Sequence, residues 1–155
     1  MLELKDFEAA YNKVQEVVLP TKLIKSDYFS DQTGNDVYLK PENMQLTGAY
    51  KIRGAYYKIS TLSEEEKAKG LITASAGNHA QGVALAAARQ GVKATIVMPT
   101  TTPLLKVNRT KDLGAEVILH GDVYDEACAH ALDLAAEHGY TCLLYTSPSP
   151  RDRSV

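Results

Sequence analysis

The chain has 155 residues, of which 45% are hydrophobic, and its formal net charge is −2. This length suits one domain, and the apolar content excludes a chain that is disordered by composition. Acidic and basic residues are mixed and no basic block occurs, so we predict no nucleic-acid partner. The two cysteines, Cys128 and Cys142, form neither a disulfide framework nor a metal-ligand cluster, so we predict no metal site.

The sequence also argues against export and membrane insertion. The first residues are charged and contain no apolar segment of the kind found in secretory signals. No apolar run is long enough to span a bilayer. We therefore expect a cytoplasmic protein with no membrane partner.

The N-terminal third of the sequence predicts two helices and a short strand. Residues 6–18 carry apolar side chains at helical spacing, with Asp6 as the N-cap and Pro20 as the stop signal. Residues 37–40 are typical of a short strand. A second helix is expected to begin near Thr47 or Gly48, and its buried stripe is formed by Ile52, Ala55, Tyr56 and Ile59.

Strands and helices alternate in the rest of the chain. A capping box at residues 63–66 begins a short helix that stops at Gly70. The expected strands cover residues 71–74, 94–98 and 116–119, and the expected helices cover 78–90, 103–113 and a segment capped by Asp122 that runs to about His138. This alternation predicts an α/β fold with an open, mostly parallel twisted sheet and helices on both faces.

The end of the sequence breaks this pattern. Tyr140 begins like another strand, but residues 147–155 contain two prolines and have the composition of a disordered end. The run from about Cys142 also resembles the translation of a sequencing adaptor. We therefore expect residues 142–155 to be a disordered or artefactual tail.

One lysine stands in a setting that favours covalent chemistry. Lys51 is expected in the first turn of its helix, one position before Ile52 and therefore at the edge of the buried stripe. The amide dipoles at a helix N-terminus disfavour a nearby ammonium, and a neutral amine can condense with an aldehyde. The alternative is an ordinary solvated lysine, which is the commoner case for a single lysine.

A polar loop follows one strand later. Residues 73–82 read TASAGNHAQG and join a strand to a helix, which is the place where open α/β sheets bind ligands. Backbone N–H groups there can bind a carboxylate, and Asn78 offers an amide to a ring hydroxyl. In the alternative interpretation Ser75 and Asn78 only cap the helix, and His79 is structural.

These two motifs together resemble those of a known family. Residues 40–54, KPENMQLTGAYKIRG, resemble the lysine signature of the serine/threonine dehydratases, and 73–82 resemble their asparagine loop. Residues 96–99, IVMP, also fit, and the resemblance runs to about residue 141. The threonine dehydratases, or threonine ammonia-lyases, are the most similar group. These are enzymes of the tryptophan-synthase-β fold, so the resemblance implies pyridoxal 5'-phosphate as cofactor, a small amino-acid substrate and a homo-oligomeric full-length protein.

The resemblance also implies roles for individual residues. Lys51 would bond to the cofactor, Tyr50 would lie beside its ring where the family commonly has phenylalanine, and Asn78 would contact the ring oxygen. Ala76 stands where serine racemases carry a serine, which favours α,β-elimination of L-threonine or L-serine to a 2-oxo acid and ammonia. The loop around the substrate carboxylate would consist of Ser75, Ala76, Gly77 and His79.

The resemblance further implies a division of the chain. Residues 1–47 would be the opening elements of a larger cofactor domain, and residues 48–141 a smaller α/β domain. The family's glycine-rich phosphate loop does not occur in this sequence, whose ten glycines are scattered. We therefore expect an N-terminal fragment with little or no turnover.

Other functions stay open at this point. A non-catalytic Rossmann-like ligand-binding module would need G-x-G-x-x-G after a strand, and Gly77 and Gly82 do not give that spacing. A serine racemase-like enzyme with the same cofactor is a second alternative. An inert truncated product is a third.

Overall fold

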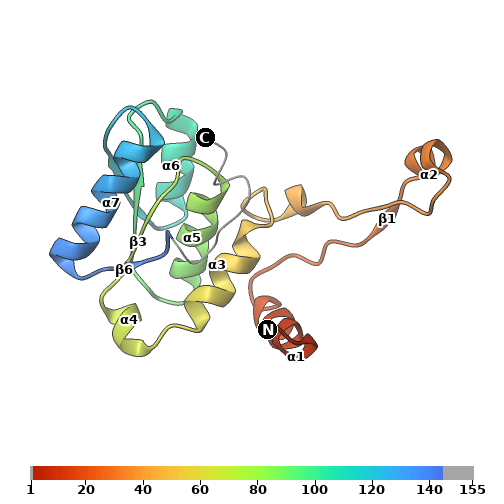
Figure 1. The fold of residues 1–155 in the computed structure, drawn as a ribbon, viewed down its shortest axis with the longest axis horizontal. Helices are drawn as coiled ribbons and strands as arrows, with labels where there is room; N and C mark the ends of the chain where they lie inside the picture. The colour runs from red at the N-terminus through yellow and green to blue at the C-terminus, as the bar shows by residue number, and fades with distance from the viewer. Residues whose placement is uncertain (1, 145–155) are drawn as a thin grey trace.

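The computed structural model describes residues 2–144, and within them a four-stranded parallel sheet forms the centre (Figure 1). Its strands are β3 (Leu71–Ala74), β4 (Ala94–Met98), β5 (Glu116–Leu119) and β6 (Thr141–Cys142), in the order β5-β4-β3-β6. Thr73 pairs with Ile96, and Val97 pairs with Ile118. The predicted α/β fold with a parallel sheet is confirmed.

Helices cover both faces of this sheet, which explains why β3 and β4 are buried along their whole length. The helices are α3 (Lys51–Ser60), α4 (Glu64–Ala68), α5 (Asn78–Arg89), α6 (Leu104–Asp112) and α7 (Tyr124–His138). Ile96 and Met98 pack with α3, α5 and α6, whereas Val97 packs with α7, because successive side chains of a strand point to opposite faces. None of the helices in residues 2–144 has both the length and the apolar character that a membrane span requires.

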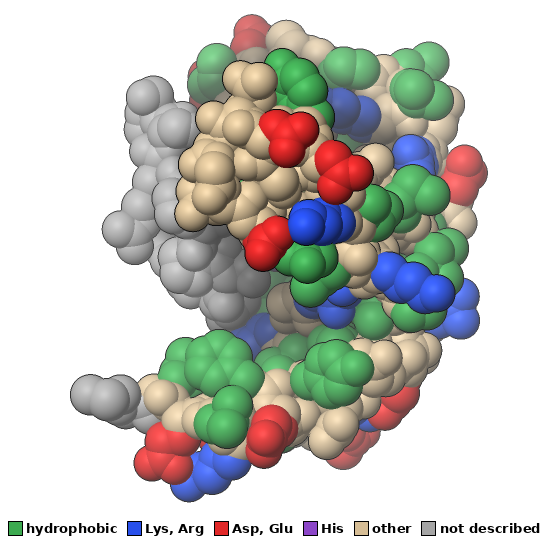
Figure 2. Space-filling model, turned by 90° about the vertical axis from the view of Figure 1, so that its right-hand side faces the viewer, with side chains coloured by type: hydrophobic (Ala, Val, Ile, Leu, Met, Phe, Trp, Pro, Cys, Tyr) green, Lys and Arg blue, Asp and Glu red, His purple; other side chains and the backbone are tan. Residues whose placement is uncertain are grey.

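The N-terminal elements form an arm that projects from this body (Figure 1). They are α1 (Leu4–Val14), β1 (Ile24–Lys25), α2 (Asp27–Thr33), β2 (Tyr38–Leu39) and the 3₁₀ turn η1 (Glu42–Met44), with β1 antiparallel to β2. The sequence did not predict β1 or α2. Large apolar side chains are exposed on the ribbon and on α2, namely Leu23, Ile24, Tyr28, Phe29, Tyr38 and Leu39. Hydrophobic side chains are scattered over the surface on this side of the molecule (Figure 2).

The first helix is shorter than predicted and its cap differs. The expected N-cap, Asp6, is the third helical residue, and its carboxylate accepts from the Glu3 N–H at 2.8 Å in a reciprocal capping box. Phe7 and Tyr11 are more than 60% exposed, while Val14 is buried. Of the apolar side chains predicted to be buried along α1, the one at its C-terminal end, where α1 contacts α3, is therefore buried.

Two other helix starts differ from the prediction. Helix α3 begins at Lys51, because Gly48 adopts a φ of 69° and its N–H donates to the Gln45 carbonyl at 2.7 Å, which closes a turn first. Helix α7 has Val123 at its N-cap. The predicted cap, Asp122, instead accepts from the Thr100 hydroxyl at 2.8 Å.

The ordered chain continues past the expected start of the tail. Cys142 belongs to β6 and pairs with Ile72, and the N–H of the buried Leu143 donates to the Ile72 carbonyl at 2.9 Å. Backbone pairing thus includes residues that we had assigned to the tail. The rest of that segment, residues 145–155, lies outside the described residues.

Candidate active site

The turn that carries Lys51 lies directly against α5. Gly82 makes this approach possible, because a Cβ at this position would come within 3.1 Å of the Lys51 carbonyl carbon and 3.2 Å of the Ile52 nitrogen. Gly82 is only one turn after Asn78, the first residue of α5. The close packing of α3 and α5 therefore brings the lysine motif and the start of the polar loop's helix to the same region of the molecule.

Lys51 is half-buried at the first position of α3. Its Nζ lies 5.9 Å from the centroid of the Tyr50 ring, which is near the outer limit for a cation–π contact. Tyr50 itself is 48% exposed. The two residues predicted to hold the cofactor ring thus lie together, and Tyr50 is accessible to a ligand.

Residues 75–79 follow the carboxyl end of β3, as predicted. The Ser75 hydroxyl oxygen accepts from the N–H groups of Gly77 and Ala80, at 3.3 and 3.2 Å. Ser75 thus accepts from one of the free N–H groups in the first turn of α5, whose N-cap is Gly77. Asn78 is exposed, whereas Ala76 and His79 are half-buried.

The Gly77 backbone is accessible from one side. A Cβ added to Gly77 would meet no heavy atom within 4 Å, so a ligand can approach the main chain closely there. Helix α5 begins at the next residue, and a helix N-terminus presents N–H groups that have no intrahelical partner. This combination suits a carboxylate or a phosphate.

Two buried polar atoms lie next to the loop without a hydrogen-bond partner among residues 2–144. They are Oγ1 of Thr73, at the end of β3, and Oε1 of Gln81, in the early part of α5. Gln81 is only 6% exposed. Buried polar atoms are normally hydrogen-bonded, so these two indicate a place where a polar ligand can complete the bonding. Neither atom is marked by the sequence pattern, although both residues belong to the polar loop segment 73–82, because burial without a partner is a property of the folded chain.

An ion pair supports the lysine turn from the other side. Arg53 donates from Nε and Nη2 to the two carboxylate oxygens of Glu42, at 2.8 Å each. The Thr21 hydroxyl also donates to Glu42, at 2.6 Å. The Arg53 guanidinium is the main reason that the pKa of Glu42 falls to about 2, against the opposing effect of partial burial. Glu42 was quoted in the motif but given no role.

A separate cavity of about 640 Å³ opens at the amino ends of the strands. Its lining includes Lys67, Lys69 and Glu116 but no predicted site residue. Both lysines form ion pairs with glutamates of α4, so their charges are already offset. Because ligands of open α/β sheets bind at the carboxyl ends of the strands, the chemistry is expected at the Lys51 side instead.

The family assignment rests on both sequence and structure. The model of the family described as pyridoxal-phosphate dependent enzyme matches residues 14–149. An L-threonine ammonia-lyase from Thermotoga maritima is 52% identical over 139 residues, which is 90% of this chain and 35% of that protein. The L-threonine dehydratase catabolic TdcB of Staphylococcus aureus strain N315 is 52% identical over 142 residues, or 91% of this chain and 41% of that protein.

Solved structures agree with this assignment. A threonine deaminase isoform 2 from Solanum lycopersicum superposes with a TM-score of 0.81 at 42% identity, over 91% of this chain and 43% of that one. A maize serine racemase gives a TM-score of 0.86 at 31% identity, over 95% of this chain and 44% of that one. This chain belongs to the pyridoxal-phosphate dependent enzyme family, and it spans about two fifths of the length of these relatives.

The residues present fit the cofactor of this family in three respects. Lys51 supplies an amine, the accessible backbone at Gly77 can receive an anionic group, and Asn78 exposes an amide beside them. The unpartnered side-chain oxygens of Thr73, in β3, and Gln81, in α5, are further groups that could hydrogen-bond a ligand there. No cluster of three or more metal-ligating side chains occurs among residues 2–144.

Proposed function

We propose that this chain is part of an enzyme that uses pyridoxal 5'-phosphate to convert L-threonine or L-serine into a 2-oxo acid and ammonia. The observation that carries the proposal is the contact between Gly82 and the Lys51 backbone, which joins the two motifs in one region. Relatives that are 52% identical and named threonine ammonia-lyase or threonine dehydratase support the choice of reaction.

Each predicted residue has a defined task in this proposal. Lys51 would hold the cofactor, and its amine would take the proton from Cα of the substrate. Tyr50 would lie beside the cofactor ring, and Asn78 would donate to the ring oxygen. The substrate carboxylate is bound by the loop formed by Ser75, Ala76, Gly77 and His79. The bound cofactor supplies the electron sink that makes the Cα proton removable.

A racemase is the second candidate, because the maize serine racemase is structurally similar. The methyl group of Ala76 argues against it. Racemisation needs a group that delivers a proton to the opposite face of the substrate, and a methyl group has no proton to donate. With Lys51 as the base on one face, elimination of the β-hydroxyl is the outcome that this loop favours.

The biological setting is part of the same proposal. We expect a cytoplasmic enzyme that forms homo-oligomers. The staphylococcal relative is named catabolic, so a degradative role is at least as well supported as one in isoleucine biosynthesis.

The test is to incubate the chain with pyridoxal phosphate, reduce it with borohydride and map the modified lysines by peptide mass spectrometry. Modification should concentrate at Lys51 and should disappear in Lys51→Ala, while Lys58→Ala, a matched change on the same helix, should retain it. Modification spread evenly over the surface lysines would contradict the proposal. Ammonia release from L-threonine measures how much turnover this chain supports, and we expect little. If Lys51 is not modified and addition of NAD raises the melting temperature of the chain, the Rossmann-like alternative is favoured.

A further inference from the structure

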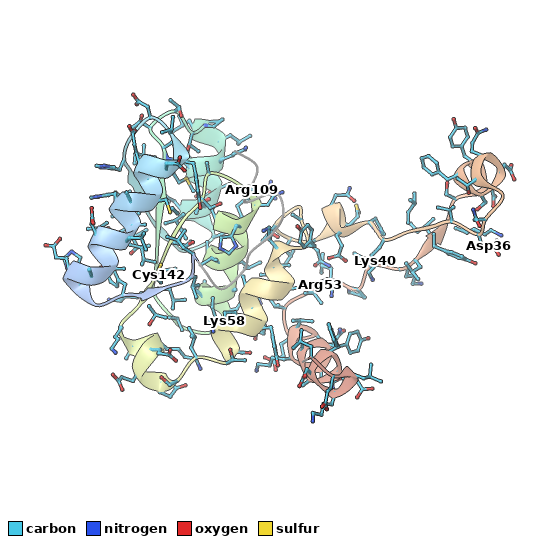
Figure 3. All side chains as sticks on the ribbon, viewed as in Figure 1. Asp36, Lys40, Arg53, Lys58, Arg109 and Cys142 are labelled. Carbon is cyan, nitrogen blue, oxygen red and sulfur yellow. The ribbon has the colours of Figure 1, made fainter. Side chains whose placement is uncertain are left out.

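The ion pair between Arg53 and Glu42 connects the two ends of the segment that carries Lys51. It joins two residues eleven positions apart, and the segment between them contains both the turn at residues 45–48 and Lys51. The pair therefore closes a loop around the lysine motif. Figure 3 shows Arg53 at the junction where the arm meets α3.

The geometry of the pair restricts the relative orientation of the two side chains as well as the distance between them. Both bonds are 2.8 Å long and run from two different guanidinium nitrogens to two different carboxylate oxygens. A two-point contact of this kind fixes orientation as well as separation. The side chains of Arg53 and Glu42 are only 29% and 17% exposed, so water competes weakly for these bonds.

Glu42 is in turn held by the arm. The Thr21 hydroxyl donates to its carboxylate, and the Gln45 side chain makes two 2.9 Å bonds with the backbone N–H and carbonyl of Leu19. The Lys40 ammonium donates to the Thr21 carbonyl. These contacts join residues 19–21 to residues 40–45, so the carboxylate belongs to a corner supported from both sides.

The opposite side of the lysine turn is also restricted. An additional carbon at Gly82 would fit between α5 and the Lys51 backbone only if the two backbones separated by a few tenths of an ångström. The Thr47 hydroxyl donates to the Ala49 carbonyl inside the buried part of the preceding turn. The first turn of α3 is thus enclosed between α5 and the Glu42–Arg53 pair.

We infer that Arg53, through its two-point bond with Glu42, is a positioning residue that sets where the Lys51 amine lies. The inference rests on the proposed function, since a fixed lysine is useful only if that lysine reacts. Arg53 follows Lys51 by two positions, about 200° around the helix, so it points away from the amine and acts through the backbone. A reacting amine must be held close to its productive geometry, and a rotation of this turn would displace it.

The experiment measures the position of Lys51 without the cofactor. The folded chain is treated with a trace of acetic anhydride, and the acetylation rate of Lys51 is divided by that of Lys58 on the same helix. Arg53→Lys keeps the charge but loses the two-point bond, and Glu42→Gln keeps the shape but loses the charge. Each should change the ratio by about threefold or more. The matched control Arg89→Lys, at the exposed end of α5, should leave the ratio unchanged.

A double-mutant cycle distinguishes positioning from general loosening. If the two residues act only together, Glu42→Gln combined with Arg53→Lys should change the ratio no more than the larger single change does. An unchanged ratio in folded Arg53→Lys and folded Glu42→Gln overturns the inference, and so does an equal rise in reactivity at every lysine. Should Arg53→Lys fail to fold, Glu42→Gln alone decides. The pyridoxal phosphate modification of the unaltered chain is scored separately, so a failure of the proposed function is seen independently of this result.

Discussion

At the scale of single residues, the candidate site depends on contacts that only the folded chain brings together. The sequence predicted Lys51 and residues 75–79 as site residues, because the amine and amide groups of a motif can be recognised from residue type and spacing alone. It could not identify Gly82 as the point where α5 meets the Lys51 backbone, since this contact depends on how two helices are placed. The Glu42–Arg53 pair was missed for the same reason, although both residues were in the quoted segment.

Gly82→Ala tests the close approach of α5 to the lysine turn. The added methyl group would lie 3.1–3.2 Å from backbone atoms of Lys51 and Ile52, which cannot rotate away. We expect a loss of about 1–3 kcal/mol in the free energy of unfolding, measured by urea denaturation. The control is Gly54→Ala at an exposed position of α3, where alanine should be neutral or slightly stabilising. A stability of Gly82→Ala equal to that of the unaltered chain would show that the helices separate freely.

Glu42 should make the stability of the chain depend on acid pH. Its pKa falls from 4.5 to about 2 in the folded chain, mainly because of the Arg53 bonds. A lowered pKa stabilises the fold above the unfolded value of 4.5, and this stabilisation is lost as pH falls from 4.5 toward 2. With allowance for solvent screening, we expect Glu42→Gln to cost about 2 kcal/mol at pH 7.

The measurement is urea denaturation of the unaltered chain and Glu42→Gln between pH 7 and pH 3. The difference in unfolding free energy between the two proteins should stay constant down to about pH 4.5 and should shrink as pH decreases further. Glu65→Gln is the matched control, because Glu65 is a glutamate on the exposed surface of α4 that pairs with a single lysine. A difference that stays constant with pH would mean that the stabilising charge is not the Glu42 carboxylate.

At the scale of elements, local sequence predicted those parts whose partners are also local. Strands β3, β4 and β5 were predicted at their observed bounds. For β3 and β4 the signal is a nearly continuous apolar run, which is typical of strands covered on both faces, whereas β5 is a partly exposed edge strand. The capping box at Ser63 and Glu66 was also confirmed. By contrast, β1 and α2 have no buried residues in the described chain, so no apolar periodicity marked them. Their boundaries are set by hydrogen bonds such as the Ser26 cap.

The segment that follows α1 is joined to α3 by a hydrogen bond as well as by apolar packing. Tyr56 donates to the Glu16 carboxylate at 2.7 Å, and desolvation followed by this bond raises the pKa of Tyr56 to about 12. Tyr56→Phe should therefore lower the unfolding free energy by about 1 kcal/mol. This loss should be present in full below pH 10, the usual tyrosine value, and should vanish as pH rises from 10 toward about 12, because the tyrosine of the unfolded chain ionises first.

Hydrogen exchange measured by mass spectrometry checks where this loss acts. Amides of α1 should exchange faster in Tyr56→Phe, while those of β4 should change only in proportion to global stability. Tyr57→Phe is the matched control, because the neighbouring ring is half-buried and its hydroxyl makes no hydrogen bond within residues 2–144. Equal effects of the two substitutions would contradict the role assigned to the Tyr56–Glu16 bond.

At the scale of the whole molecule, stability is distributed unevenly. The body contains an apolar cluster on each face of the sheet, whereas the ribbon β1–β2 and helix α2 expose their large apolar side chains. A single two-stranded ribbon is at most marginally stable in water. Within residues 2–144, the arm is fixed to the body by the bonds that Glu16 and Glu42 make with α3 and by Val14, Val17 and Val18, which join the apolar cluster.

We therefore expect two separate classes of amide protection in one chain. Amides of residues 22–40 should exchange at rates within about tenfold of those of an unfolded peptide, because few buried contacts oppose local opening. Amides of β3 and β4 should be protected to the limit set by global unfolding.

Phe29→Ser, on the exposed arm, should change the unfolding free energy by less than about 0.5 kcal/mol, whereas Val97→Ser between β4 and α7 should cost several times more. Strong protection of residues 22–40 would show that the arm finds a partner in solution, for example through its unpaired strand edges, and that the exposed apolar side chains are covered there.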